Sequence, residues 1–134
     1  MEIPKFEVEF GWPGDGGLGE RLVQQIIDGT KTATCGFKRA YTDEELAEVF
    51  GSVGQLQRAR SCEGPVRCII RVTDAFETPF GDPDPRLVAG EGDGSDVAKF
   101  QRDHVIAWKS DFPDSEPGPD EPLVVELFEL VSVL

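Results

Sequence analysis

The chain has 134 residues, of which 39% are hydrophobic, and its 26 acidic and 13 basic side chains give a net charge of −13 at pH 7. This length suits one core, so we expect residues 1–134 to form a single domain, and the acidic surface disfavours duplex DNA as a partner. The sequence has neither an apolar run of membrane length nor a signal-peptide pattern, so we expect a cytoplasmic protein with no membrane partner.

The first third of the chain predicts a strand, a loop, a helix and a second strand. Alternating residues at 6–10 predict a short strand, or a strap across the core, and the Gly-rich stretch 11–17 predicts a loop. Apolar residues at helical spacing predict an amphipathic helix from Gly17 to Asp28, with Gly29 as its C-cap. A strand over 32–37 follows.

The middle of the chain predicts a helix and a strand pair. Thr42 and Glu45 form a capping-box pattern, so a short helix should run through Phe50. Residues 55–60 and 66–76 alternate in hydrophobicity on either side of a turn, which is the pattern of two strands that each bury one face.

The last third predicts a turn or short helix near Leu87, then a helix that Ser95 caps and that ends near Lys109. Residues 110–122 are rich in Pro and acids and predict a loop, and residues 123–134 predict a long central strand. About five strands and three helices in mixed order indicate an α+β domain, with a small curved sheet or barrel flanked by helices.

Two polar segments contain the residue types that amide hydrolysis needs, if the fold brings them together. Thr34 supplies a hydroxyl nucleophile, and Lys31 accepts its proton if burial favours the neutral amine. Glu91 either holds Lys31 in place or binds the amino group of a base and donates a proton. Lys31 and Thr34 would lie on opposite faces of a strand but converge around the turn that Gly29 predicts.

Structural alternatives exist for each residue. In the structural interpretation, Lys31 lies at a solvent-facing helix end, where a cation interacts favourably with the helix dipole. Thr34 lies in a strand because of its β-propensity alone. Glu91 can be a surface acid, and Asp93 with Ser95 can form a loop-and-cap pair.

Other polar or reactive side chains favour structural interpretations. His104, the single histidine, lies on the apolar face of its predicted helix and is expected to be a hydrogen-bonded core residue, with the wall of the site as the second interpretation. Cys35 should point away from Thr34 into the core. Four arginines on the two middle strands either form a solvated face that offsets the acids or a phosphate-binding patch: Arg58, Arg60, Arg67 and Arg71.

The three cysteines, Cys35, Cys62 and Cys68, are odd in number and lack the two-residue spacing of zinc sites. We therefore expect reduced thiols. No His, Cys and carboxylate set has the spacing of metal ligands, so no metal or cofactor is expected.

The order of motifs resembles the ASCH domain family, one of the PUA-like barrels. The matching segments run from Gly29-x-Lys31-Thr32-Ala33-Thr34, through Val66–Val72 and Glu91-Gly92-Asp93-x-Ser95, to the terminal Val124–Phe128. The resemblance implies a small mixed β-barrel of about five to six strands, flanked by about three helices, with a cleft for RNA or nucleosides. One bacterial branch removes the acetyl group of N4-acetylcytidine, and its Lys, Thr and Glu match Lys31, Thr34 and Glu91. Other members are ribonucleases.

The sequence departs from the family pattern at three positions. Ala89 stands where longer bacterial members have the first Glu of the acidic stretch, Phe100 replaces a Trp, and Gln55 replaces an Asp.

We therefore expect an RNA- or nucleoside-related protein that hydrolyses an amide on a small modified nucleoside, with Lys31, Thr34 and Glu91 as catalytic residues. One alternative is a non-catalytic module that binds RNA or nucleotides, and a second is a ribonuclease. The expected partner is a modified nucleoside or a short single-stranded RNA. The side chains expected to contact it are those of Thr32, Trp12, Asp93, Ser95, Arg58 and Arg102.

Overall fold

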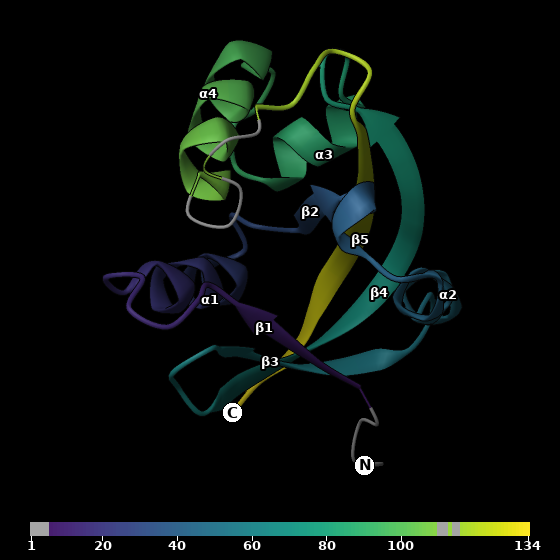
Figure 1. Ribbon diagram of the computed structural model, residues 1–134. Coiled ribbons are helices and arrows are strands. Elements are labelled where there is room, and N and C mark those ends of the chain that lie inside the picture. Colours follow the sequence, from purple (N-terminus) through teal and green to yellow (C-terminus); the bar gives the residue numbers. More distant parts are fainter. Residues whose placement is uncertain (1–5, 110–112, 114–115) are drawn as a thin grey trace.

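The computed structural model describes residues 6–109, 113 and 116–134, and its centre is one mixed sheet (Figure 1). The sheet has the strand order β1-β3-β4-β5-β2. Its strands are β1 (Phe6–Phe10), β2 (Ala33–Phe37), β3 (Leu56–Ser61), β4 (Val66–Pro79) and β5 (Pro122–Val133). β1 runs parallel to β3, and the other pairs are antiparallel.

The sheet curls because β4 is long and bends. β4 pairs with β3 and with β5, and its register against β5 shifts between Ile69 and Ile70 and again between Val72 and Asp74. Such bulges bend a strand and increase its twist. Figure 1 shows β4 arching around the molecule. The α+β fold with a small curved sheet is therefore confirmed, and the ladders between the described strands leave β1 and β2 as its two edges.

In the part of the chain that the structure describes, four α-helices and one 3₁₀ turn connect the strands: α1 (Leu18–Asp28), η1 (Lys38–Ala40), α2 (Asp43–Gly51), α3 (Pro85–Gly90) and α4 (Val97–Trp108). In Figure 1, α1 and α4 lie to the left of the curved sheet and α2 lies to its right. No helix in the described ranges combines the length and the apolar character that crossing a bilayer requires.

Among the described residues, two buried clusters fix α1, α3 and α4 on the sheet. The first joins α3 and α4 to the start of β5 and to β2, and consists of Ala33, Phe37, Phe80, Leu87, Val88, Phe100, Leu123 and Val125. The second joins α1 to the other end of the sheet, and consists of Phe10, Val23, Ile26, Ala59, Cys68, Ile70 and Phe128. The edge strands β1 and β2 therefore belong to different clusters.

Most local predictions are confirmed. Gly29 ends α1 with a φ of +83°, a conformation that favours glycine, and its N–H donates to the carbonyls of Gln25 and Ile26. Both hydrogen bonds of the capping box between Thr42 and Glu45 are present.

The predicted cap of α4 is wrong. Asp96 is the N-cap, because its Oδ1 accepts a hydrogen bond of 3.0 Å from the N–H of Lys99, three residues later. Ser95 contributes its carbonyl, which accepts from the N–H of Val97. Asp and Ser are comparable N-caps, so the sequence alone does not decide between neighbours. The predictions for the N-terminal residues 1–5 and for part of the loop 110–122 lie outside the described residues.

Candidate functional site

A cavity of about 770 Å³ lies between the two edge strands of the sheet. Glu9 and Phe10 of β1 line it on one side, and Thr34 and Cys35 of β2 line it on the other. Parts of α1 and α4 complete its wall, from Leu18 to Gln25 and from Lys99 to Trp108. This volume falls in the range of about 300–1,000 Å³ that is usual for small-molecule sites.

Lys31 lies at the wall of this cavity, and its side chain is 3% exposed. After the cap at Gly29, the N–H groups of Thr30 and Lys31 both donate to the carbonyl of Gln25, which turns the chain tightly toward β2. The Lys31 Nζ donates to the Ala33 carbonyl at 2.7 Å and to Glu91 Oε2 at 3.0 Å. A buried ammonium requires such partners, because burial without them is costly.

Glu91 reaches Lys31 because Gly90 allows a close backbone approach. The Gly90 carbonyl accepts a 2.7 Å hydrogen bond from the N–H of Thr32, which ties the end of α3 to the chain just before β2. A Cβ on Gly90 would lie only 2.5 Å from the Cβ of Ala33. The absence of that atom places Glu91, the next residue, beside Lys31. The sequence did not decide whether Lys31 and Glu91 meet; in the structure they form an ion pair.

His104 contacts the same carboxylate from α4. Its Nε2 lies 3.5 Å from Glu91 Oε2, and its Nδ1–H donates to the Phe100 carbonyl at 2.9 Å. The ring centroid is 4.2 Å from that of Phe100 and 5.1 Å from that of Trp108. His104 is therefore hydrogen-bonded and packed, as expected of a core residue, but it also lines the cavity.

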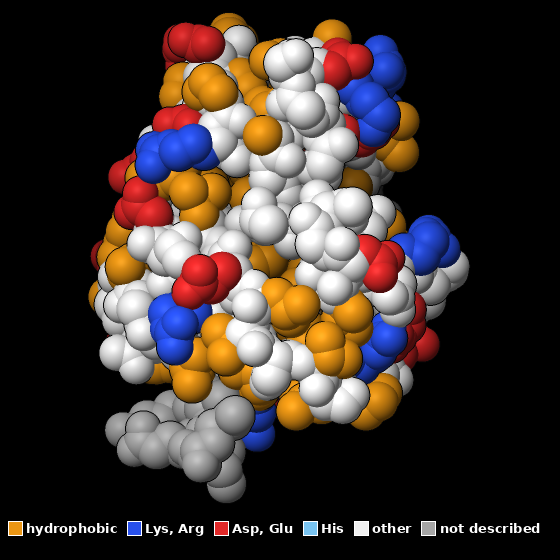
Figure 2. Space-filling model, turned by 180° about the vertical axis from the view of Figure 1, so that it is seen from behind, with side chains coloured by type: hydrophobic (Ala, Val, Ile, Leu, Met, Phe, Trp, Pro, Cys, Tyr) orange, Lys and Arg blue, Asp and Glu red, His pale blue; other side chains and the backbone are white. Residues whose placement is uncertain are grey.

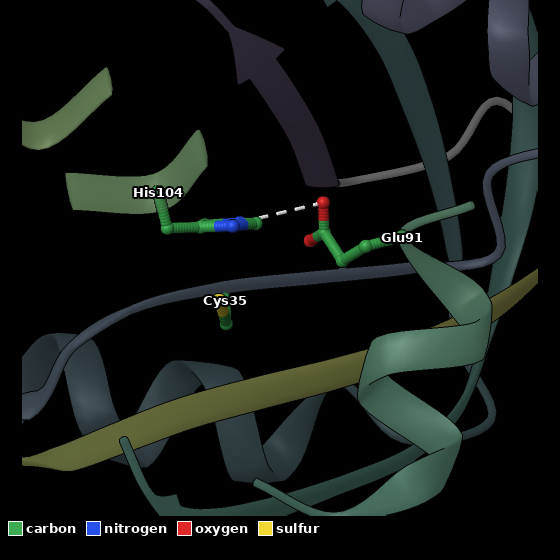
Figure 3. Close-up of side chains that lie close together, drawn as sticks. All are labelled: Cys35, Glu91 and His104. Carbon is green, nitrogen blue, oxygen red and sulfur yellow. Dashed lines mark ion pairs between the residues drawn. The ribbon is translucent and has the colours of Figure 1, made fainter. Parts of the chain in front are cut away.

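The thiol of Cys35 completes the cluster (Figure 3). The sulfur of Cys35, an oxygen of Glu91 and a nitrogen of His104 all lie within 4.8 Å of one another. Cys35 and Thr34 are consecutive yet both line the cavity, since the cavity reaches the edge of β2. Cys35 packs against the first buried cluster, as the core interpretation expects, and it also reaches the cavity.

The electrostatics hold the carboxylate of Glu91 between two cations. Burial alone would raise the pKa of Glu91, but the charges of Lys31 and His104 and their hydrogen bonds lower it below its ordinary value. Burial alone would lower the pKa of His104, but its hydrogen bonds to Cys35 and Glu91 raise it. Burial raises the pKa of the Cys35 thiol. At neutral pH the cluster therefore consists of a carboxylate, an imidazolium and a thiol.

The loop before α1 forms one edge of the cavity and contributes Trp12. The Asp15 carboxylate organises this loop by accepting hydrogen bonds from the N–H groups of Trp12, Gly17 and Gly19. These hydrogen bonds lower the pKa of Asp15 against the opposing effect of burial, and the bond from the Gly19 N–H has the largest effect.

The residues predicted to contact substrate separate into two groups. Trp12 and Asp93 line the cavity, and Asp93 accepts a 2.9 Å hydrogen bond from Lys99 Nζ. The others lie outside the cavity lining: Thr32, Ser95 and Arg102 are exposed, and Arg58 lies on β3. Ala89, where the family pattern has Glu, is also exposed and outside the lining.

The arginines of the middle strands are paired with acids. These pairs are Arg58–Glu7, Arg60–Glu7, Arg60–Glu9, Arg67–Glu20 and Arg71–Glu129. On the face that Figure 2 shows, basic and acidic side chains are interspersed and no broad basic patch appears. The arrangement fits the expected solvated strand face, on which the arginine charges offset those of nearby acids.

Comparison with known proteins agrees with this architecture. A sequence model of the ASCH domain matches residues 9–132. The chain belongs to the ASCH domain family. This family is RNA- and nucleotide-related. A comparison with curated protein sequences found no significant match.

Two solved structures show the same fold. Protein EF3133 from Enterococcus faecalis V583 is 25% identical, with a TM-score of 0.79 over 100% of this chain and 85% of that one. An ASCH domain from Lactobacillus crispatus JV V101 is 24% identical, with a TM-score of 0.72 over 93% of this chain and 79% of that one. The PUA-like fold expected from the ASCH resemblance is therefore confirmed.

Proposed function

We propose that this ASCH protein hydrolyses the amide of a small modified nucleoside such as N4-acetylcytidine, with Lys31, Thr34 and Glu91 as catalytic residues. The observation that supports the proposal is the buried Lys31–Glu91 pair, 3.0 Å apart, at the wall of a cavity that Thr34 also lines. The three residues thus border one cavity although Glu91 is distant from the other two in sequence.

The pair supplies both the base and the acid of the reaction. A bound substrate displaces water from the cavity, and this further desolvation raises the pKa of Glu91 against the lowering effect of Lys31 and His104. Lys31 then passes one proton to Glu91, which leaves an amine and a carboxylic acid. The Lys31 amine takes the proton of the Thr34 hydroxyl while the Thr34 oxygen attacks the acetyl carbon. Glu91 returns its proton to N4 of the base as the C–N bond breaks, so cytidine leaves and Thr34 holds an acetyl ester.

In the second half of the reaction, water hydrolyses the Thr34 acetyl ester by the same proton exchange between Lys31 and Glu91. Lys31 again passes a proton to Glu91 and takes one from the attacking water molecule. The ester bond to Thr34 breaks, and Glu91 returns its proton to the Thr34 oxygen. One amide and one water molecule give one amine and one carboxylic acid, and the three side chains recover their starting charges.

The surroundings of the cavity favour a nucleoside over a polymer. Trp12 offers an aromatic face on which a base can stack. The strand arginines that a long RNA would need are paired with Glu7, Glu9, Glu20 and Glu129. An uncharged nucleoside does not suffer the repulsion that the net charge of −13 exerts on polyanions.

Chromatographic detection of cytidine released from N4-acetylcytidine tests the proposal. Thr34→Val removes the hydroxyl with little change in shape, and Thr32→Val is the matched control because Thr32 is exposed and outside the cavity lining. We expect release by the wild type and by Thr32→Val, and none by Thr34→Val. Full activity of Thr34→Val would exclude Thr34 as the nucleophile.

Release by none of these proteins would contradict the proposal and favour the alternatives. Steeply salt-dependent binding of single-stranded RNA without cleavage would then indicate a binding module. RNA cleavage that is lost in Lys31→Ala would indicate a ribonuclease.

A further inference from the structure

The cluster of Cys35, Glu91 and His104 contains the three side-chain types that transition metals prefer. They come from β2, from the residue after α3 and from α4, and their donor atoms lie within 4.8 Å of one another (Figure 3). Within the described ranges, this is the one group of three or more His, Cys, Asp or Glu side chains with such spacing.

The spacing suits a tetrahedral ion. Zinc bonds of about 2.0–2.3 Å place two tetrahedral ligands about 3.3–3.8 Å apart. The distance of 3.5 Å between His104 Nε2 and Glu91 Oε2 falls in this range. All separations between the donor atoms are within 4.8 Å. Any two donors must therefore approach each other by about 1 Å at most to reach the ligand separation of a tetrahedral zinc ion.

Hydrogen bonds already orient two of the three donors as metal sites require. Metal-bound histidines usually donate their second ring N–H to a carbonyl or carboxylate, and ligating carboxylates are themselves hydrogen-bonded. The Nδ1–H of His104 donates to the Phe100 carbonyl, so Nε2 is the nitrogen that faces Glu91. Lys31 holds the Glu91 carboxylate through Oε2. Because metal ligands must be deprotonated, binding releases the Cys35 thiol proton and the Nε2 proton of the His104 imidazolium to solvent. The Lys31 charge opposes a cation, whereas the resulting Cys35 thiolate and the Glu91 carboxylate together balance a divalent ion.

We propose that Cys35, Glu91 and His104 bind a divalent transition-metal ion of the zinc class, with a fourth coordination position open to the cavity. All three side chains line the cavity, so a water molecule or a ligand can reach that position. Three protein ligands and one open position distinguish catalytic zinc sites from closed structural ones.

Ion binding does not depend on the proposed amide hydrolysis. An ion that takes up the Glu91 carboxylate prevents its proton exchange with Lys31, so the ion-bound and hydrolytic forms are alternative states of one cavity. Binding must therefore be measured directly and not through activity.

Cobalt(II) titration of chelator-treated protein is the test. Cobalt(II) reports a thiolate ligand through a charge-transfer band, and tetrahedral coordination through intense visible bands. Cys35→Ser removes the proposed thiolate, and Cys62→Ser is the matched control because Cys62 lies outside the cluster. We expect one ion per chain in the wild type and in Cys62→Ser. In Cys35→Ser we expect loss of the charge-transfer band and affinity at least about tenfold lower.

A second measurement covers the case in which Cys35→Ser does not fold. The chain has 1 histidine, so the imidazole nitrogen signals in an NMR spectrum of the wild type belong to His104 alone. Stoichiometric Zn²⁺ should shift the Nε2 signal strongly and the Nδ1 signal weakly. An unchanged imidazole spectrum, the lack of saturable binding, or equal binding by Cys35→Ser would each overturn the proposal.

Discussion

Replacing Gly90 by Ala should destabilise the protein, because the contact between α3 and the chain before β2 leaves no room for a methyl group. The new Cβ would lie 2.5 Å from the Ala33 Cβ and 3.1 Å from the Ala33 nitrogen. Two carbon atoms in contact normally stand about 3.5–4.0 Å apart, so this junction must open by about 1 Å. Gly90 has no positive φ, so alanine causes no backbone strain of its own.

The magnitude follows from overpacking. Inserting a methyl group into a packed site costs about 1–3 kcal/mol. The unfolding entropy of about 2.1 cal/mol/K per residue amounts to about 0.28 kcal/mol/K for 134 residues, so Tm should fall by about 4–11 °C. Because the same junction places Glu91 beside Lys31, we also expect the variant to lose cytidine release.

Calorimetric or circular-dichroism melting curves measure this effect, and Gly51→Ala is the control. Gly51 also ends a helix, and a Cβ there would meet nothing within 4 Å. Gly51→Ala should leave Tm unchanged or raise it slightly, since alanine reduces the entropy of the unfolded chain. A Gly90→Ala variant as stable as Gly51→Ala would refute the close approach.

Three further predictions test other parts of the structure. Asp15→Asn should lower Tm at neutral pH, and its difference from the wild type should vanish in acid. A carboxyl with a lowered pKa stabilises the fold above its ordinary pKa of 3.8 and loses that effect as the pH falls through its folded pKa. Melting curves between neutral and acidic pH measure this difference in Tm, and a constant difference would contradict the prediction. Burial, aided by the Glu126 charge, raises the pKa of Tyr41 to about 12, so ultraviolet titration of this only tyrosine should show ionisation well above its ordinary value of 10 in the native protein and near 10 in urea. Asp96→Ala should cost about 1 kcal/mol in a urea unfolding experiment, and Ser95→Ala should cost nothing measurable; the reverse order would restore Ser95 as the cap of α4.

The elements of the fold were predictable because each has a local signal. The helix before Gly29 and the capping box at Thr42 depend on neighbouring residues only, and both are confirmed. The cap of α4 was not predictable in the same way, because Ser95 and Asp96 are adjacent and chemically equivalent as caps.

The candidate site was predictable only in part, because its contacts depend on tertiary structure. The polar segments around Lys31 and Glu91 were evident in the sequence, but their contact depends on the close approach at Gly90. Cys35 was expected to face the core, and the wall of the site was the second interpretation of His104 after a core position. The missed signal is the position of His104 one helical turn after Phe100, in the helix that follows the Glu91 segment directly.

The kinetics of Lys31→Met test most directly whether Lys31 supplies the base at the cavity wall. The matched control is Lys38→Met, since Lys38 forms an exposed ion pair with Glu77. With N4-acetylcytidine as substrate, we expect kcat/KM to fall by about 10²–10⁴-fold in Lys31→Met, the usual effect of losing a general base, and to be unchanged in Lys38→Met. Wild-type kcat/KM in a folded Lys31→Met variant would contradict this role of Lys31.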